Sequence, residues 1–231
     1  MIKIGLIDDG AGICAATAKI MRCLSADCVA MIADTPFGGL SLSELASLAV
    51  TSAEKLQNVG CDAVVICSQA MTYAAKRRTF PLPTYFCETP VLHSATYTAS
   101  NVVVFGDRYS FRQVKIPNAI VIDAEKFSEI ALTCGDKQIA DYIEKTLAPY
   151  EGQFDCIALS DGLMSLKAEC FNMAFPSVRV FDSVDGVVRK LKKAFNKQVK
   201  RQRAKGGYEP SVKFVNGSCE EIVANYSDFF E

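Results

Sequence analysis

The sequence has little of what metal centres, membrane proteins and secreted proteins require. His93 is the only histidine and no two cysteines stand in a CxxC arrangement, so we expect no zinc site and no other metal site. No apolar stretch approaches the roughly 20 residues that a membrane-spanning helix needs. The short apolar N-terminus runs directly into Asp8 and Asp9, which is not the pattern of a signal peptide.

Charge and cysteine content narrow the class further. The formal net charge is −1 over 231 residues, so the surface as a whole does not attract polyanions. Ten cysteines are too few for a disulfide scaffold of this length, and several lie in apolar runs, where a thiol packs as a small hydrophobic group. We therefore predict a cytoplasmic protein with reduced thiols that binds neither nucleic acid nor membrane.

Short β-branched runs alternate with amphipathic stretches along the chain. The predicted strands are Ile2–Ile7, Val29–Ile32, Ala63–Ile66, Val102–Phe105, Ala119–Ile122, Cys156–Leu159 and Val178–Phe181. The predicted helices are Ala11–Leu24, Ser43–Asn58, Asp136–Leu147, Gly186–Phe195 and a short final one over Cys219–Phe229. This alternation predicts an α/β fold with mainly parallel sheets flanked by helices. Ligands of such sheets bind beyond the carboxyl ends of the strands.

Two internal echoes indicate two related halves. Asp62–Ser68 and Asp155–Asp161 each hold an acid, four mostly apolar residues and then a small nucleophilic side chain. A second echo pairs Ile4–Asp9 with Val178–Ser183. Together they predict two pseudo-symmetric lobes with a site in the cleft between them.

The echoes also predict where reactive groups lie. Cys67 and Ser160 stand at matching strand ends, and we predict that both face the shared cleft. The predicted lobe boundaries are 1–90 with roughly 183–231 for the first lobe, and roughly 91–182 for the second.

Five segments, in order along the chain, resemble the glutamate racemase family. Ile7–Gly12 is similar to the family's first strand end, Asp-Ser-Gly, and Asp34–Gly38 to its Asp-Thr followed by Pro-Tyr-Gly. Ile66–Ala70 stands where the family has Ala-Cys-Asn-Thr-Ala around its first catalytic cysteine. Leu82–Glu88 is similar to a Pro-Val segment that ends in Glu-Pro, and Asp182-Ser183 to a later Asp-Ser pair.

The resemblance implies a two-lobed, cofactor-independent enzyme that interconverts L- and D-glutamate for peptidoglycan synthesis. It allows a homodimer and a small-molecule substrate, an amino acid or a related acid. It implies catalytic roles for Cys67, Asp8 and Ser160. The substrate-binding residues that it implies are Asp9, Pro36, Phe37, Gly38, Ser68, Gln69 and Asp161. We add Asp107, because it closely follows the predicted strand Val102–Phe105 and so lies where ligands of such sheets bind.

The chain departs from the family at the second catalytic thiol. The family's Gly-Cys-Thr-His corresponds to Leu159–Gly162, so the thiol is replaced by Ser160. Racemisation needs two acid/base groups on opposite faces of one carbon, and a serine hydroxyl is a far poorer base than a thiol. Asp9 and Asp161 also add negative charge, which favours a less acidic or a cationic substrate unless Arg108 compensates.

Three functions on this scaffold stay open. Cys67 could racemise an amino acid with Ser160 or Asp161 as its partner, or transfer a proton on one face only, as in a decarboxylation or isomerisation. The third function is a binding or regulatory protein that has lost the reaction.

Other segments have simpler interpretations. Gly10–Ala15 formally fits the G-x-G-x-x-A dinucleotide fingerprint, with Asp34 near the place of the ribose-binding acid, so an NAD-dependent oxidoreductase is a distant alternative. Arg189–Lys205 holds nine lysines and arginines with one apolar stripe, which predicts an exposed surface helix. Glu88 and His93 are expected to be structural.

Overall fold

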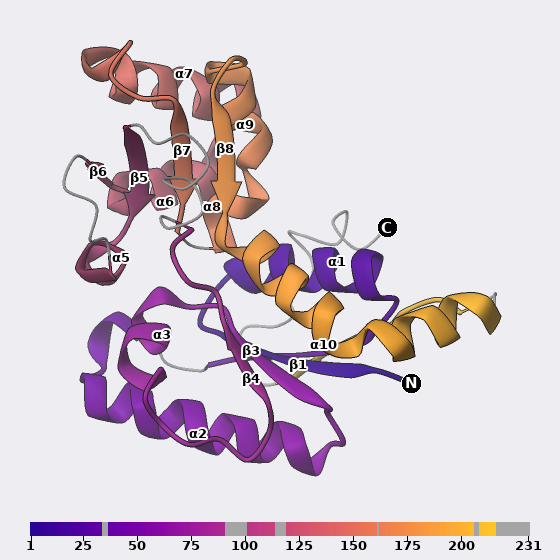
Figure 1. Ribbon diagram of the computed structural model, residues 1–231. Coiled ribbons are helices and arrows are strands. Elements are labelled where there is room, and N and C mark those ends of the chain that lie inside the picture. The colour runs from indigo at the N-terminus through magenta and orange to yellow at the C-terminus, as the bar shows by residue number, and fades with distance from the viewer. Residues whose placement is uncertain (34–36, 91–100, 114–118, 161, 206–207, 216–231) are drawn as a thin grey trace. The chain divides into compact units, whose positions relative to one another are not determined.

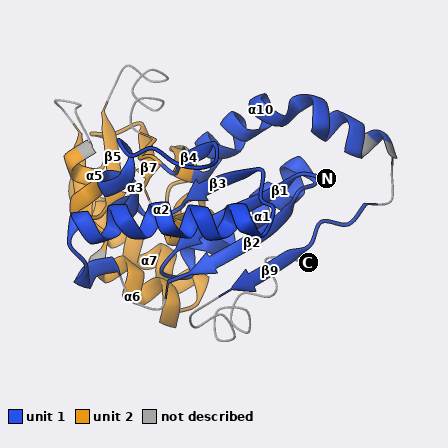
Figure 2. Cartoon of the chain, turned by 90° about the horizontal axis from the view of Figure 1, so that it is seen from below, with its two compact units in different colours: residues 1–87, 184–231 blue, residues 88–183 orange. Residues whose placement is uncertain are grey.

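The computed structural model describes residues 1–33, 37–90, 101–113, 119–160, 162–205 and 208–215 (Figure 1). The chain forms two compact units, which Figure 2 shows in different colours. Unit 1 comprises Met1–Cys87 and Val184–Glu231, and unit 2 comprises Glu88–Ser183. Among the helices in these ranges, none combines the length and the apolar character needed to span a bilayer.

Unit 1 is built on a five-stranded sheet in the order β4-β3-β1-β2-β9. Its strands are β1 (Lys3–Asp8), β2 (Asp27–Ile32), β3 (Ala63–Ile66), β4 (Thr84–Phe86) and β9 (Val212–Val215). Every neighbouring pair is parallel, so all five carboxyl ends lie along one edge of the sheet.

Helices cover both faces of this sheet. In Figure 1, α1 and α10 lie on one face and α2 and α3 on the other. Their bounds are α1 (Gly12–Leu24), α2 (Leu42–Asn58), α3 (Gln69–Ala75) and α10 (Ser183–Lys205), with a 3₁₀ turn, η1 (Phe37–Gly39). The close approach of α2 explains Gly5, because a Cβ there would meet the end of the Leu56 side chain at 2.7 Å.

Unit 2 is built on a four-stranded parallel sheet in the order β6-β5-β7-β8. Its strands are β5 (Val102–Gly106), β6 (Ile120–Asp123), β7 (Cys156–Leu159) and β8 (Arg179–Asp182). Its helices are α5 (Arg108–Gln113), α6 (Glu125–Thr133), α7 (Asp136–Leu147), α8 (Gly162–Leu166) and α9 (Ala168–Ala174), with a 3₁₀ turn, η2 (Ala148–Tyr150).

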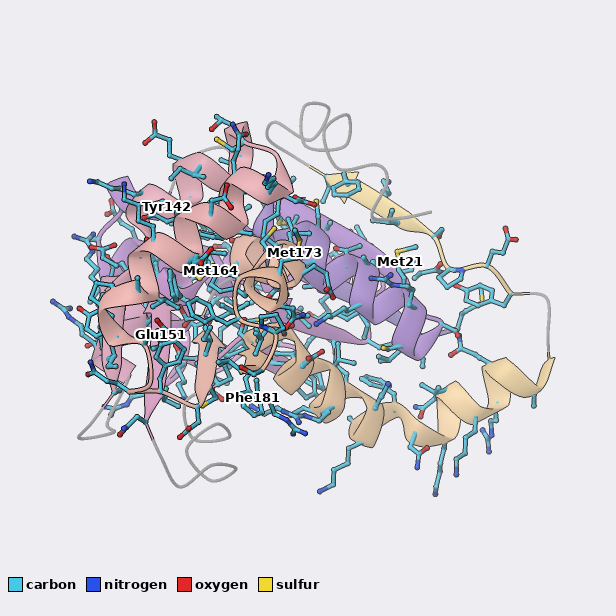
Figure 3. The ribbon with its side chains drawn as sticks, turned by 90° about the horizontal axis from the view of Figure 1, so that it is seen from above. Met21, Tyr142, Glu151, Met164, Met173 and Phe181 are labelled. Atoms are coloured by element: carbon cyan, nitrogen blue, oxygen red, sulfur yellow. The ribbon has the colours of Figure 1, made fainter. Side chains whose placement is uncertain are left out.

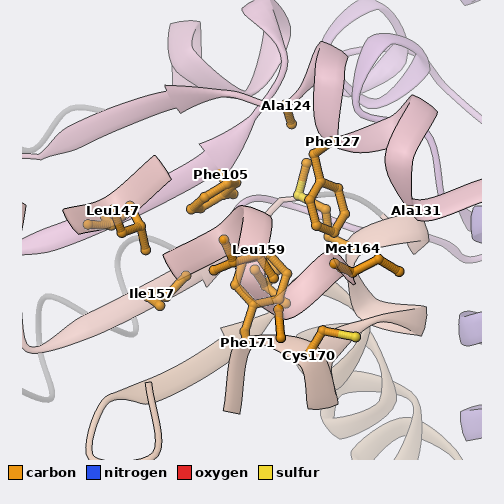
Figure 4. Close-up of a cluster of buried hydrophobic side chains, with 14 of the residues drawn as sticks. Phe105, Ala124, Phe127, Ala131, Leu147, Ile157, Leu159, Met164, Cys170 and Phe171 are labelled. Atoms are coloured by element: carbon orange, nitrogen blue, oxygen red, sulfur yellow. The ribbon is translucent and has the colours of Figure 1, made fainter. Parts of the chain in front are cut away.

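One face of this second sheet carries an aromatic core. Phe105 of β5 meets Phe171 of α9 edge to face, with 5.1 Å between ring centroids, and Phe127 of α6 lies 5.4 Å from Phe171 (Figure 4). Tyr142 and Met164, labelled in Figure 3, extend the same cluster along α7 and α8. Such edge-to-face contacts add to the burial energy and fix how the helices pack on the sheet.

The two sheets share one topology, which confirms the predicted α/β fold of two parallel sheets flanked by helices. Read from β2, unit 1 runs β2-β1-β3-β4, and unit 2 runs β6-β5-β7-β8 in the same connection order. The first echo in the sequence is therefore real, because β3 and β7 occupy equivalent positions. The second echo was wrong, because β1 corresponds to β5 and β8 corresponds to β4. Its matches reflect the apolar composition that all buried parallel strands share.

The basic segment forms an exposed helical surface, as predicted. Leu191 and Val199 of α10 are buried, and the lysines of the helix whose burial the structure describes, up to Lys200, are exposed. Figure 3 shows long side chains with nitrogen tips projecting from this helix. The helix is longer than the predicted Gly186–Phe195, because the high helix propensity of its lysines and arginines carries it on to Lys205.

Candidate active site

The carboxyl ends of β1 and β3 bring Asp8 and Cys67 next to each other in unit 1. Ile7 pairs with Ile66 in the sheet, and the Cys67 N–H donates to the Ile7 carbonyl at 3.0 Å. Both side chains are buried. Asp8 does not cap α1, because the N-cap of that helix is Ala11 and no side chain caps it. The Oδ1 of Asp8 instead accepts the Asp9 N–H at 3.0 Å.

A second thiol lies beside Cys67. Cys87 directly follows β4, the strand next to β3, and its N–H donates to the Ile66 carbonyl at 2.9 Å. The two thiols are close enough for Cys87 to contribute to the raised pKa of Cys67, and both are buried. Cys87 follows no strand that the sequence predicts, so sequence reasoning missed this pairing.

The surroundings of Cys67 favour its neutral form. Interaction with the neighbouring Cys87 thiol, burial, and the negative charge of Asp8 raise the pKa of the Cys67 thiol well above its usual value. Burial, followed by the charge of Asp8, raises the pKa of Cys14 in α1 to about 12. The protonated thiol of Cys67 is therefore favoured over the thiolate at neutral pH.

Ser68 and Gln69 hold the end of β3 in place. Ser68 is the N-cap of α3, and its Oγ accepts the Met71 N–H at 3.3 Å. Gln69 is buried, and its Nε2 donates to the Cys87 carbonyl at 2.5 Å. Both predicted substrate-binding residues thus have an architectural role at the edge where Cys67 lies.

Asp9 is linked to the loop that follows β2. Its Oδ2 accepts the Phe37 N–H at 2.6 Å. The Phe37 side chain is buried, and Gly38 is exposed in η1. Pro36, the remaining predicted residue of this loop, lies outside the described residues, as do Asp34 and Thr35.

In unit 2, Ser160 lies at the carboxyl end of β7, the position equivalent to Cys67. It is fully buried, and its Oγ donates to the Phe105 carbonyl at 2.6 Å. Packing is tight, because a Cβ on Gly106 would lie 2.3 Å from Ser160 Oγ and 2.7 Å from Ser110 Cβ. The hydroxyl proton of Ser160 is thus held by the backbone.

Asp107 follows β5 and caps α5. Its Oδ1 accepts the backbone N–H groups of Tyr109 and Ser110, at 3.0 and 2.7 Å, and the Ser110 hydroxyl at 2.8 Å. Arg108 lies over the Tyr109 ring at 4.9 Å and donates to the Tyr109 hydroxyl at 3.0 Å. Asp161 and His93 lie outside the described residues.

Solved structures provide the comparison that decides the fold. A glutamate racemase from Campylobacter jejuni superposes with a TM-score of 0.76 at 14% identity, covering 99% of this chain and 98% of that one. A glutamate racemase isoform from Bacillus anthracis gives 0.73 at 16%, covering 98% and 91%. An aspartate racemase from Picrophilus torridus gives 0.64 at 14%, covering 87% and 98%.

The chain has the fold of the glutamate and aspartate racemases. No protein-family model and no curated protein matches the sequence. The racemase fold therefore emerges from the arrangement of the strands and helices rather than from overall sequence identity.

On this racemase fold, the described residues bring together a carboxylate and two thiols in unit 1. No three His, Cys, Asp or Glu side chains within those ranges are placed to hold a metal ion. All nine cysteines of the described part of the chain are free thiols, seven of them buried. The chemistry that this edge supports is proton transfer by a thiol beside a carboxylate.

Proposed function

We propose that the protein is an amino-acid isomerase of the Asp/Glu racemase family that moves the α-proton of its substrate through Cys67, without a cofactor. The observation that carries the proposal is the buried thiol of Cys67 beside the buried carboxylate of Asp8, at the ends of adjacent interior strands of a racemase fold. Thiols suit such transfers because their pKa can be moved toward neutrality by nearby charge.

The substrate itself would switch Cys67 between its two forms. The charge of Asp8 contributes to the raised pKa of the thiol. A substrate α-ammonium group next to Asp8 offsets that charge and lowers the pKa of the thiol, so that it can give up its proton and act as a base. Asp8 is therefore proposed as the residue that receives the ammonium group.

The proposed reaction is the interconversion of the L and D forms of an amino acid. Glutamate is the first candidate, since the structural neighbours include glutamate racemases, and D-glutamate would serve peptidoglycan synthesis in the cytoplasm. Asp9, however, places a further carboxylate near this edge, where the family has a neutral serine. Amino acids with a neutral or cationic side chain therefore belong on the test panel.

A second candidate is one-face proton transfer by Cys67 alone. It is favoured by Ser160, whose hydroxyl donates its proton to the Phe105 carbonyl instead of presenting it to a ligand. A serine also lacks the low pKa that a second base requires. This candidate predicts exchange of the α-proton without inversion of the carbon.

The test follows deuterium incorporation at Cα by NMR in deuterated water. Each enantiomer of glutamate, aspartate, alanine and lysine is incubated with the protein, and chiral chromatography follows inversion. Exchange with inversion supports the racemase, and exchange with retention supports the one-face enzyme. If no substrate on the panel exchanges, the enzymatic proposal fails and a binding protein becomes the better description. Tight binding of NAD in a separate titration would instead favour the dinucleotide alternative.

A further inference from the structure

The register of β3 and β4 implies a separation between Cys67 and Cys87 that a disulfide can bridge. Strands β3 and β4 are parallel and paired from Val64 with Thr84 to Ile66 with Phe86, so the next pair in register is Cys67 with Cys87. Neighbouring strands lie about 4.8 Å apart. Disulfides join Cα atoms that are roughly 4.4 to 6.8 Å apart.

The two side chains also point toward each other. Residues that pair in register project from the same face of a sheet, so both sulfur atoms lie on one side of it, and the Cys87 thiol is close enough to contribute to the raised pKa of Cys67. The backbone under them is fixed on both sides, by the Cys87 N–H on the Ile66 carbonyl and by the Gln69 amide on the Cys87 carbonyl. Bond formation therefore needs only rotation of side chains.

We propose that Cys67 and Cys87 form a reversible disulfide, and that this pair is an oxidative modification site of the protein. The oxidant is a hydroperoxide. The Cys67 thiolate attacks the peroxide oxygen and becomes a sulfenic acid as hydroxide leaves; the Cys87 thiol then attacks that sulfur and water leaves. In total, two thiols lose two electrons and two protons, and hydrogen peroxide is reduced to two waters.

The disulfide would also switch off the proposed enzyme, a consequence that rests on the proposed function. Oxidised Cys67 carries no exchangeable proton and cannot act as acid or base. A dithiol reductant restores both thiols by exchange. Since the attacking species is a thiolate and Cys67 is held neutral, oxidation is expected to be slow at pH 7 and to accelerate as pH rises.

The test is mass spectrometry of the full-length native protein after treatment with hydrogen peroxide and capping of free thiols with N-ethylmaleimide. Trypsin places Cys67 in the peptide 56–76, together with Cys61, and Cys87 alone in the peptide 79–108. A Cys61→Ser variant makes the assignment unique. We expect the two peptides to be linked, with a loss of two hydrogen masses, and to separate on treatment with dithiothreitol.

Matched variants separate this pair from the other buried thiols. Cys14→Ser, which changes a buried thiol of α1, should leave the link intact, whereas Cys87→Ser should abolish it and leave Cys67 to oxidise irreversibly. The proposal is overturned if both thiols carry maleimide after oxidation, or if Cys87 links to a cysteine other than Cys67.

A readout of Cα exchange on the reduced and oxidised protein keeps the two proposals apart. If the disulfide forms but neither form exchanges any substrate, the isomerase fails and the modification site stands. If the protein exchanges a substrate but forms no disulfide, the modification site fails and the isomerase stands.

Discussion

Cys67 follows β3 in unit 1, and Ser160 follows β7, the equivalent strand of unit 2. Each is buried, but the two lie beside different chemical groups. Cys67 lies beside the Cys87 thiol and the Asp8 carboxylate. Ser160 gives its proton to the Phe105 carbonyl, which does not titrate. The same topological position thus holds a thiol beside a carboxylate in one unit and a hydroxyl bonded to the backbone in the other.

The largest expected effect is on the rate of Cα exchange, when the Cys67 thiol and the Ser160 hydroxyl are removed in separate variants. Cys67→Ala is expected to lower the rate of Cα exchange by about 10³-fold, within the range typical of a lost general acid/base. Ser160→Ala should lower it less than about tenfold. Single-turnover exchange in deuterated water measures both, with circular dichroism to confirm folding. Equal losses in the two variants would show that the two strand ends share the chemistry.

The tight packing around Ser160 predicts a difference in stability between two glycines. Gly106→Ala places a Cβ 2.3 Å from Ser160 Oγ and 2.7 Å from Ser110 Cβ, and should cost about 2 to 3 kcal/mol. Gly5→Ala in unit 1 meets only the movable end of Leu56, and should cost about 1 kcal/mol. Urea unfolding measures the loss in free energy of unfolding for both variants. Equal losses would mean that the packing around Ser160 adjusts to an added methyl group as easily as the Leu56 side chain does.

A thiol at position 160 should give the strand end of unit 2 an acid/base group like that of Cys67 in unit 1. Ser160→Cys replaces the hydroxyl by a group that can exchange a proton near neutral pH. We expect the ratio of inversion to exchange to rise by about tenfold over the parent, a modest part of what a well-placed acid or base supplies. The larger sulfur must leave the Phe105 carbonyl, so the variant should be less stable. An unchanged ratio, with the fold intact, would place Ser160 outside the reaction.

Most strands of the two sheets could be predicted from the sequence, because a buried strand leaves a pattern in its own residues. All seven predicted strands are present, because buried parallel strands are continuous apolar runs. Three-residue β4 is too short to stand out. Strand β9 joins the sheet beside β2 from a distant part of the chain, so its pairing leaves no local pattern.

The contacts that define the site depend on pairing, which local patterns do not encode. Cys67 was predicted as a site residue because it ends a strand in a polar context, and its catalytic role stays a prediction. Cys87 became its partner only through the register of β4 on β3. The bond from Ser160 to Phe105 depends in the same way on β7 lying beside β5. Asp107, predicted to bind substrate, caps α5 in the structure, a helix that the sequence did not predict.

The smallest expected effect is a difference between the two units in the stability that each loses at alkaline pH, because their buried thiols differ in number. Burial, as the first cause, raises the pKa of Cys61 in unit 1 and of Cys170 in unit 2 to about 11, and that of Cys14 to about 12. The pKa values of Cys28 and Cys67 are also raised. Four of these five thiols belong to unit 1.

A thiol whose pKa is raised by folding makes the folded chain less stable as pH rises. Below pH 9, the thiols are protonated in both the folded and the unfolded chain, so their contribution is fully present. Above pH 9 the unfolded chain loses these protons first, and the free energy of unfolding falls until the folded pKa is reached. Amide hydrogen exchange between pH 8 and 10, corrected for intrinsic rates, should show unit 1 losing protection before unit 2, by on the order of 1 kcal/mol. Because Cys14→Ala removes one of the four titrating groups, it should flatten the loss in unit 1 and leave unit 2 unchanged. An equal loss in both units would show that the buried thiols do not set the alkaline limit.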